Sequence, residues 1–177
     1  MKMMKKGLPV VIALISIMLF FILIGRNEQM IQHGKSIFIS LQPADPRSIL
    51  QGDYMTLRYN MNIQGEIPEG KRLKAYVKLN ALNVVSETRF NLAKGDKAWT
   101  PIFLKKIPHQ NSFYPAAQSY LFAEGLADCY SQAVFAEFKL SVKGEPLLYE
   151  LKDAQRRSLN CEAEQRWRDG SDAIRAE

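Results

Sequence analysis

An apolar run near the N-terminus dominates the hydrophobic pattern of the chain. It extends from Leu8 to Ile24, and within it only Pro9 and Ser16 fall outside the apolar class. At 1.5 Å of rise per residue, a helix of this length spans about 25 Å, close to the ~30 Å hydrocarbon core of a bilayer. A core helix of a soluble protein is rarely apolar on every side. The pattern therefore predicts a transmembrane helix over residues 7–25, preceded by a short tip at 1–6.

The flanks of this run distinguish a retained anchor from a cleaved signal peptide. Cleavage requires small residues at positions −3 and −1, and Gly25 at −1 would place Leu23 at −3. We therefore expect an uncleaved anchor, with cleavage as the alternative. Three lysines precede the run, whereas a single arginine follows it closely. The positive-inside rule then predicts a cytoplasmic N-terminus and an extracytoplasmic domain from about residue 27.

After residue 35 the period of the apolar positions changes to two, which is typical of half-buried β-strands. Ile37, Ile39 and Leu41 alternate with polar residues, and a turn with two prolines follows at 43–46. The same alternation predicts further strands at 53–63, 72–79, 84–92, 99–104, 135–142 and 146–151. Turn residues separate most of these strands, so we expect neighbouring strands to pair antiparallel.

A helical period occurs between residues 124 and 133. Leu126, Cys129, Tyr130 and Ala133 fall at i, i+3, i+4 and i+7, on one face of a helix. The predicted fold class is therefore α+β: a mostly antiparallel β domain with one short helix, behind a single N-terminal transmembrane helix. These patterns predict a stalk at 26–35, the domain at 36–152 and a polar tail at 153–177.

The charge of the chain is concentrated around the apolar run. The 177 residues carry 24 Lys and Arg against 18 Asp and Glu, a formal charge of +6. Four of the basic residues flank the run, and residues 27–177 carry 20 basic and 18 acidic side chains. The domain is therefore nearly neutral, and we expect no nucleic-acid partner outside the cytoplasm. With only two His and two Cys in the chain, we expect no metal site and no cofactor.

The least ordinary segment of the domain is QPADPRSILQGDYMTLRY, at 42–59. It contains a complete GDYXXLXY pattern, and the chain resembles the GDYXXLXY family of bacterial membrane-anchored proteins. The residues that carry the resemblance are Gly52, Asp53, Tyr54, Leu57 and Tyr59 of the motif, Asp45 and Arg47 ahead of it, and Glu124 and Gly125 near the predicted helix. The resemblance covers about residues 37–151.

This resemblance implies a location and a kind of partner, but no established activity. It implies a single-pass protein of the bacterial inner membrane, held in the lipid bilayer through residues 7–25, with its C-terminal domain in the periplasm. It also implies a multi-pass membrane protein as a partner.

Three functions are compatible with the polar residues around the motif. In the first, the domain is an accessory or interaction module, and Asp45, Gly52 and Asp53 form turns and caps. In the second, Asp45, Arg47, Asp53 and Glu124 line a cleft in which Arg47 binds a small anionic ligand or an envelope polymer. In the third, two of these carboxylates serve as acid and base in a hydrolase. We favour the first.

Cys129 and Cys161 allow two alternatives. In an oxidising periplasm they form a disulfide that attaches the C-terminal segment to the helix. Closing a loop of about 32 residues stabilises a fold by roughly 3–4 kcal/mol. In the other alternative, Cys129 is buried as a small apolar residue of the helical stripe, and Cys161 stays outside the domain.

Overall fold

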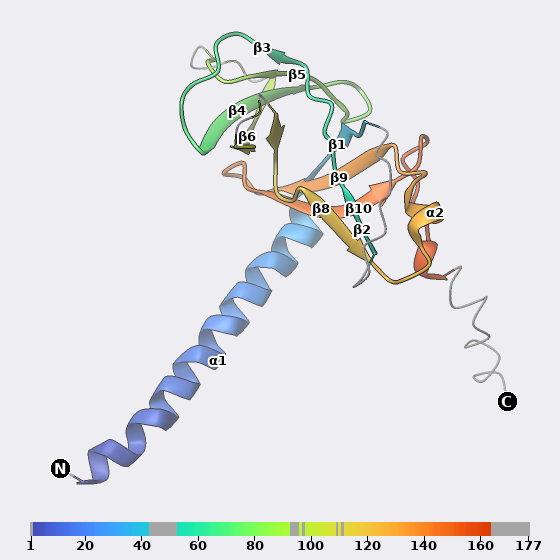
Figure 1. Cartoon of the computed structure of the whole chain (residues 1–177). Helices are drawn as coiled ribbons and strands as arrows, with labels where there is room; N and C mark the ends of the chain where they lie inside the picture. Colours follow the sequence, from blue (N-terminus) through green and yellow to red (C-terminus); the bar gives the residue numbers. More distant parts are fainter. Residues whose placement is uncertain are drawn as a thin grey trace, which may run out of the picture. The chain divides into compact units, whose positions relative to one another are not determined.

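A computed structural model of the chain describes residues 2–42, 53–92, 96, 98–108, 110 and 112–163. The chain forms two compact units, Met1–Gly34 and Lys35–Glu177. Figure 1 shows the first unit as a long helix and the second as a β-rich domain. The prediction of a mostly antiparallel β domain behind one N-terminal apolar helix is confirmed.

The first unit consists of the helix α1, Lys2–His33. Its section Val11–His33 has a mean hydropathy of 1.9 in its most apolar window, and none of that window is buried. By length and composition this helix is able to cross a bilayer, and it is consistent with a transmembrane helix.

The expected stalk at 26–35 is largely a continuation of α1. Residues 26–33 contain no Gly or Pro, and Gln32 Nε2 donates to Glu28 Oε1 one turn away at 2.6 Å. The helix ends at Gly34, whose N–H donates to the carbonyl of Met30 at 2.9 Å. The first strand of the domain begins at the next residue.

The named elements of the second unit, within the described residues, are short strands and the single-turn helix α2. In chain order these elements are β1 Lys35–Ser40, β2 Asp53–Thr56, β3 Ile63–Gln64, β4 Arg72–Leu79, β5 Val85–Arg89, β6 Trp99–Lys106, β7 Phe113–Tyr114, β8 Ser119–Phe122, α2 Ala127–Tyr130, β9 Phe135–Leu140 and β10 Pro146–Lys152. Within the described residues they form sheets of order β1-β9-β10, β2-β8 and β3-β5-β4-β6-β7. The pairs are antiparallel, except that β3 and β5 are parallel.

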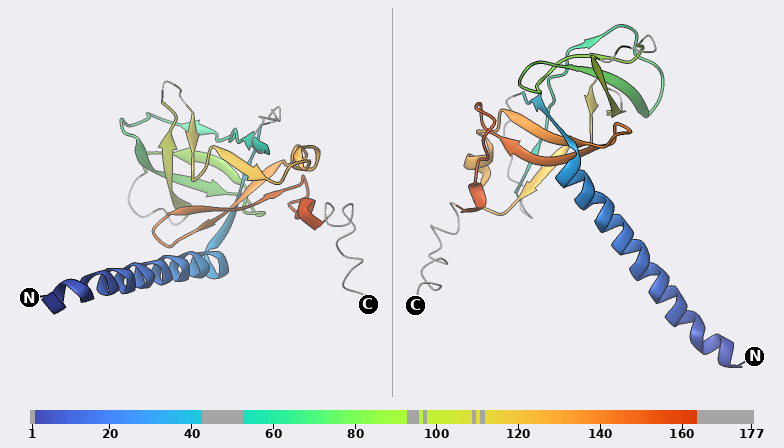
Figure 2. Two further views of the ribbon diagram at one scale, coloured as in Figure 1. Left: turned by 60° about the horizontal axis from the view of Figure 1, so that its bottom comes forward. Right: turned by 180° about the vertical axis from the view of Figure 1, so that it is seen from behind.

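One hydrophobic core joins the three sheets. Figures 1 and 2 show the five-stranded sheet on one side of the domain and the β1-β9-β10 sheet on the other. Alternate residues of each strand fill the space between them, and they include Ile37, Ile39, Leu73, Ala75, Val77, Ile102, Leu104, Ala136, Phe138 and Leu140. Each of these side chains is at most 7% exposed. The period of two in the sequence thus identifies the core positions.

The segment 53–63, predicted as one strand, is broken in the structure. β2 pairs with β8, and Tyr59 then forms an isolated bridge with Leu41 before β3 begins. The segment changes partner after Thr56, so no single ladder spans it. The alternation of faces nevertheless persists, because Met55 and Leu57 are buried and Tyr59 packs against the core.

The helix predicted over 124–133 is a single turn, and two strands were not predicted. Gly125 precedes α2 with φ at +84°, which is outside helical conformation. After α2 the chain leaves the helix to pair with strands, since Val134 N–H donates to the Lys152 carbonyl at 2.9 Å. β7 and β8 lie at 113–122, where Pro115 and a run of small residues hide any alternation.

Candidate functional site

The β2–β8 ribbon brings the first half of the motif beside a segment more than 60 residues later in the chain. Asp53 lies opposite Phe122, and Tyr54 lies opposite Leu121. The start of the GDYXXLXY motif therefore lies at the end of the ribbon from which the chain continues to Glu124 and the α2 turn. The start of β2 lies beside the end of β8 because the two strands pair antiparallel, although they are far apart in the sequence.

Several of the predicted site residues lie outside the described residues. Asp45, Arg47 and Gly52 fall there, and only the backbone of Asp53 is described. Glu124 is exposed in the turn before α2, where Leu126 N–H donates to the Ala123 carbonyl at 3.3 Å. The convergence of these residues on one polar cleft therefore stays a prediction.

The second half of the motif faces the core. Leu57 is 4% exposed, and the Tyr59 ring packs on Phe138 with 5.7 Å between ring centroids. The Tyr59 hydroxyl donates to the Ala117 carbonyl at 2.7 Å. Burial raises the pKa of this phenol well above its usual value. These contacts tie the segment after β2 to the connection between β7 and β8 and to β9, so Leu57 and Tyr59 have a structural role.

The first tyrosine of the motif faces the opposite way. Tyr54 is 36% exposed, and its cross-strand neighbour Leu121 is 78% exposed. Directly opposed side chains on an antiparallel pair lie within contact distance of one another. We call Tyr54 and Leu121 the ribbon pair. They form an apolar spot on a ribbon whose other face packs against the core.

A pocket of about 550 Å³ adjoins the second half of the motif. Its lining residues are Gln42, Thr56, Leu57, Arg58, Tyr59, Ile107, Gln110, Ser112, Phe113 and Gln118. Among the described residues, Arg58 is the charged member of this lining, which contains amides and hydroxyls but no carboxylate. Such a lining suits a neutral polar or anionic ligand.

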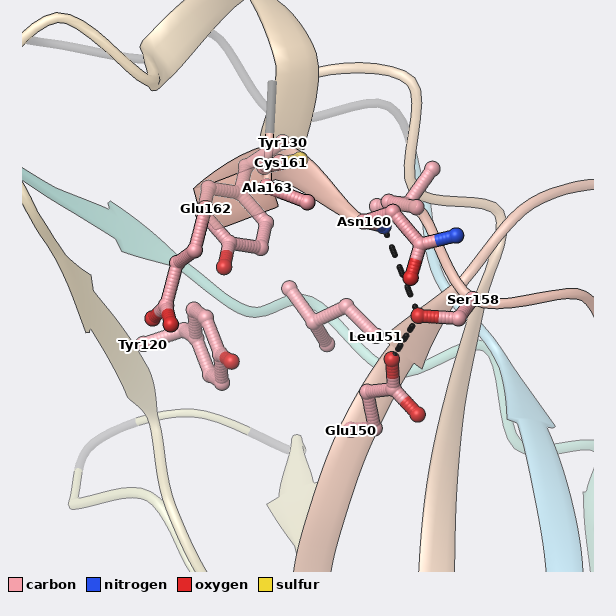
Figure 3. A pocket seen from close by; sticks show the side chains of 10 residues that line it. Tyr120, Tyr130, Glu150, Leu151, Ser158, Asn160, Cys161, Glu162 and Ala163 are labelled. Carbon is pink, nitrogen blue, oxygen red and sulfur yellow. Dashed lines mark hydrogen bonds between the residues drawn. The ribbon is translucent and has the colours of Figure 1, made fainter. Parts of the chain in front are cut away.

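A second pocket, of about 300 Å³, lies between β8, α2, β10 and the segment that follows β10. Figure 3 shows Tyr120 and Tyr130 near Glu162 on one side, and Glu150 with Ser158 on the other. The Ser158 hydroxyl donates to Glu150. Burial raises the pKa of Tyr130, and Tyr120 and the nearby carboxylates raise it further. The charged side chains that line this pocket are thus acidic, whereas the charged side chain of the Arg58 pocket is basic.

A disulfide joins Cys129 of α2 to Cys161, so the first of the two alternatives for these cysteines is the one found. Cys161 is 2% exposed and belongs to the core. The beginning of the expected polar tail, up to residue 163, is consequently part of the domain.

A buried ion-pair cluster on the outer side of β9 was missed by the sequence reasoning. Glu137 is 6% exposed, and its carboxylate lies 3.2 Å from Lys139 Nζ and 3.3 Å from Lys152 Nζ. Lys152 also contacts Glu150 at 2.6 Å. Burial alone would raise the pKa of Glu137, but hydrogen bonds from Ser36 and the two lysines lower it overall. Because the charges are mutually paired, we assign the cluster a structural role.

The histidines add no candidate centre within the described residues. His33 ends α1, and His109 lies outside the described part of the chain. Across the residues that the structure describes, no group of three His, Cys, Asp or Glu side chains is placed to hold a metal ion.

These observations define a class: a small antiparallel β domain behind an N-terminal apolar helix, with a two-stranded ribbon that carries its sequence motif. The chain belongs to the GDYXXLXY protein family, because its residues 16–151 match the model of that family. The matched range begins within the apolar part of α1 and ends in β10, so Cys161 lies beyond it. Neither the curated proteins nor the solved structures give a match.

Proposed function

We propose that this protein is a membrane-anchored interaction module whose ribbon pair binds a partner in the same membrane. In this proposal α1 anchors the chain in the bacterial inner membrane with its N-terminus in the cytoplasm. The domain from Lys35 onward is then periplasmic. The exposure of Tyr54 and Leu121 side by side is the observation that carries the proposal.

The energetics of the ribbon pair support a binding role. Leu121 lies on a strand yet leaves most of its side chain in water, which gives up about 1.5–3 kcal/mol relative to burial. A tyrosine beside it supplies ring area and a polar tip, a combination common at the energetic centres of interfaces. A partner that covers both side chains recovers this free energy.

The anchor supports a partner within the membrane. Three lysines before the apolar run and one arginine after it favour the cytoplasmic N-terminus. Anchoring also confines the domain near the bilayer surface, where the loops of a multi-pass protein are at high effective concentration. Such a partner agrees with what the family resemblance implies.

Co-purification from native membranes in a mild detergent tests this proposal. Leu121→Ser and Tyr54→Ser should each reduce the recovered multi-pass protein at least tenfold, while the domain keeps its melting temperature. Val142→Ser is the matched control, because Val142 is fully exposed in the β9–β10 turn, away from the ribbon. Equal recovery with all three variants would refute the role of the ribbon pair.

The Arg58 pocket supports a second candidate function, the binding of a small anionic ligand beside the motif. The Arg58 guanidinium is the charged group in a lining of amides and hydroxyls. Arg58→Gln should abolish binding of inorganic phosphate or citrate by calorimetry and leave folding unchanged. Equal affinity of parent and variant would contradict this candidate. Hydrolysis lacks this support, because the described lining supplies no carboxylate.

A further inference from the structure

The basic residues of the domain are concentrated in one stretch of sequence. Residues 71–106 carry nine of the 20 basic side chains found in residues 27–177, but only two of the 18 acidic ones. The other residues of that range therefore have an excess of acidic side chains. This stretch forms β4, β5 and β6, the central strands of the five-stranded sheet. The near-neutral total conceals a strongly asymmetric distribution.

Strand alternation places these charges on one face of the sheet. The apolar residues of β4 face the core, so the residues between them face away from it. The register places Lys105 opposite Arg72 and Arg89 opposite Tyr76. We call the resulting surface the basic face, and its cations are Arg72, Lys74, Lys78, Arg89 and Lys105.

Aromatic rings hold four of these cations against the sheet. The pairs, with distances to the ring centroids, are Arg72 over Phe103 at 4.6 Å, Lys74 over Tyr76 at 5.6 Å, Arg89 over Trp99 at 5.2 Å and Lys105 over Tyr114 at 5.9 Å. Each contact favours the cation over the ring and limits its rotamers. The covered rings are poorly placed to stack on bases, which is how single-stranded nucleic acids are usually held. The basic face is therefore suited to recognise charge rather than base planes.

Three of the cations have no carboxylate partner among the residues that the structure describes. Arg72 pairs with Glu145, and Arg89 pairs with Glu87. Among the described residues, no Asp or Glu forms an ion pair with Lys74, Lys78 or Lys105, and all three are exposed. The negative charges of an anionic ligand would therefore pair with these three lysines.

The first residue of the domain contacts the five-stranded sheet. Lys35 begins the domain, and its Nζ donates to Thr100 Oγ1 at 3.0 Å. Thr100 alternates with Trp99 and Pro101 along β6, so its side chain lies on the opposite side of the strand from the basic face. Lys35 and the basic face thus contact opposite sides of this sheet.

We propose that the basic face binds an extended anionic glycan through its carboxylate or phosphate groups. The row from Arg72 to Lys78 on β4 is about 20 Å long, enough for several sugar units of a chain lying along the strand. This inference rests on the proposed periplasmic placement, where such polymers rather than nucleic acids are the abundant polyanions. It is independent of the ribbon pair.

The native Trp99 provides the probe for a test with the full chain in zwitterionic detergent. The sequence contains two Trp, so Trp167→Phe leaves Trp99 as the sole indole, beside Arg89 on the basic face. Polygalacturonate should change Trp99 emission with saturation, and uncharged dextran should not. Raising the salt concentration to 1 M should weaken the binding strongly, because the Debye length falls to about 3 Å.

Charge-removal variants locate the binding surface. A triple variant should weaken polygalacturonate binding by roughly tenfold or more, because several exposed ion pairs are lost together. It carries the substitutions Lys74→Gln, Lys78→Gln and Lys105→Gln. The control changes Arg156, Arg157 and Arg166 to Gln, which removes the same charge outside residues 71–106 and should alter affinity less than about twofold. Leu121→Ser should bind as the parent does, so failure of the ribbon pair and failure of the basic face are separate results.

Three results would overturn the proposal. The first is the absence of a saturable response to polygalacturonate. The second is an equal loss of affinity in both triple variants, which would indicate a general charge effect. The third is tighter binding of oligothymidylate or of phosphatidylglycerol vesicles than of polygalacturonate, which would assign the face to nucleic acid or to lipid.

Discussion

The two tyrosines of the motif provide a matched test of its structural role. Tyr59→Phe removes a buried hydroxyl that donates to the Ala117 carbonyl at 2.7 Å, while the ring retains its packing on Phe138. Tyr54→Phe removes the same atom from an exposed side chain. The two substitutions are chemically identical, so a difference between them reports the surroundings alone.

The expected magnitude follows from the hydrogen bond and its orphaned acceptor. A net hydrogen bond contributes about 0.5–1.5 kcal/mol, and leaving a partly buried carbonyl unpaired adds to that loss. We expect Tyr59→Phe to lower the free energy of unfolding by about 1–2 kcal/mol, or by roughly 3–6 °C in melting temperature. Tyr54→Phe should stay within about 0.5 kcal/mol of the parent.

The same residue predicts a pH dependence of stability. Burial raises the pKa of Tyr59 in the folded state, whereas a tyrosine in the unfolded chain ionises near pH 10. Above that pH the unfolded chain has released a proton that the folded protein retains, so stability falls as pH rises. The slope approaches about 1.4 kcal/mol per pH unit for one such residue well above pH 10, and it is about half of that at pH 10. Tyr59→Phe should therefore lose about 1 kcal/mol less than the parent between pH 10 and pH 11.

Urea titration of the full chain in zwitterionic detergent, followed by near-ultraviolet circular dichroism, measures these quantities. It should be run for the parent and both variants at pH 7, 10 and 11. Two results would refute the reasoning: an unchanged stability of Tyr59→Phe at pH 7, or a Tyr54→Phe variant that is destabilised as strongly. Either result would mean that the Tyr59 hydroxyl does not stabilise the folded domain more than the Tyr54 hydroxyl does.

Three further stability predictions use the same titration. Glu137→Gln should lower the free energy of unfolding by about 2–4 kcal/mol, because it leaves buried lysines partly unpaired. Since the pKa of Glu137 is lowered in the folded state, its contribution to the free energy of unfolding is present above about pH 4.3 and disappears as pH falls below it. The stability of the variant should therefore fall less steeply with acidification than that of the parent. An equally steep fall in both proteins would count against this. Cys161→Ser should cost roughly 3–4 kcal/mol for a 32-residue separation, and an unchanged midpoint would show that the disulfide does not constrain the domain. Thr88→Val should stabilise the protein by about 1 kcal/mol, because the fully buried hydroxyl has no hydrogen-bond partner among the described residues, and a loss of stability would disprove that description.

Local patterns in the sequence predict the strands whose partners are close by. Over 72–79 the alternation identifies β4, and its apolar positions are the buried ones. The turn between β4 and β5 forms because Asn80 Oδ1 accepts hydrogen bonds from the N–H groups of Leu82 and Val84 at 2.9 and 3.0 Å. In both cases the determining interactions lie within a few residues.

Elements that depend on distant partners could not be predicted in this way. β8 has no alternation of its own, and it forms because β2, more than 60 residues earlier, supplies its hydrogen bonds. The helical stripe at 124–133 predicts the right buried residues, Leu126 and Tyr130, but not the length of α2. Pairing of Val134 with Lys152 takes the following residues out of the helix. Tertiary hydrogen bonds override local propensity at these positions.

The candidate site shows the same division. Alternation predicts that Leu57 and Tyr59 face the core and that Tyr54 faces away, since neighbouring residues of a strand alternate in direction. It cannot reveal that Leu121 lies beside Tyr54, because the register of two distant strands is a tertiary property. The excess of basic residues over 71–106 is visible in the sequence, but only the sheet places five of them on one face.

Site-specific photo-crosslinking in native membranes tests the central claim most directly. A benzophenone amino acid at position 121 lies on the ribbon pair, and the same amino acid at position 142 lies on a fully exposed and separate turn. We predict one discrete adduct at position 121, identified by mass spectrometry as a multi-pass membrane protein, and no such adduct at position 142. No adduct at position 121, or the same adducts at both positions, would contradict the assignment of the ribbon pair as the partner-binding surface.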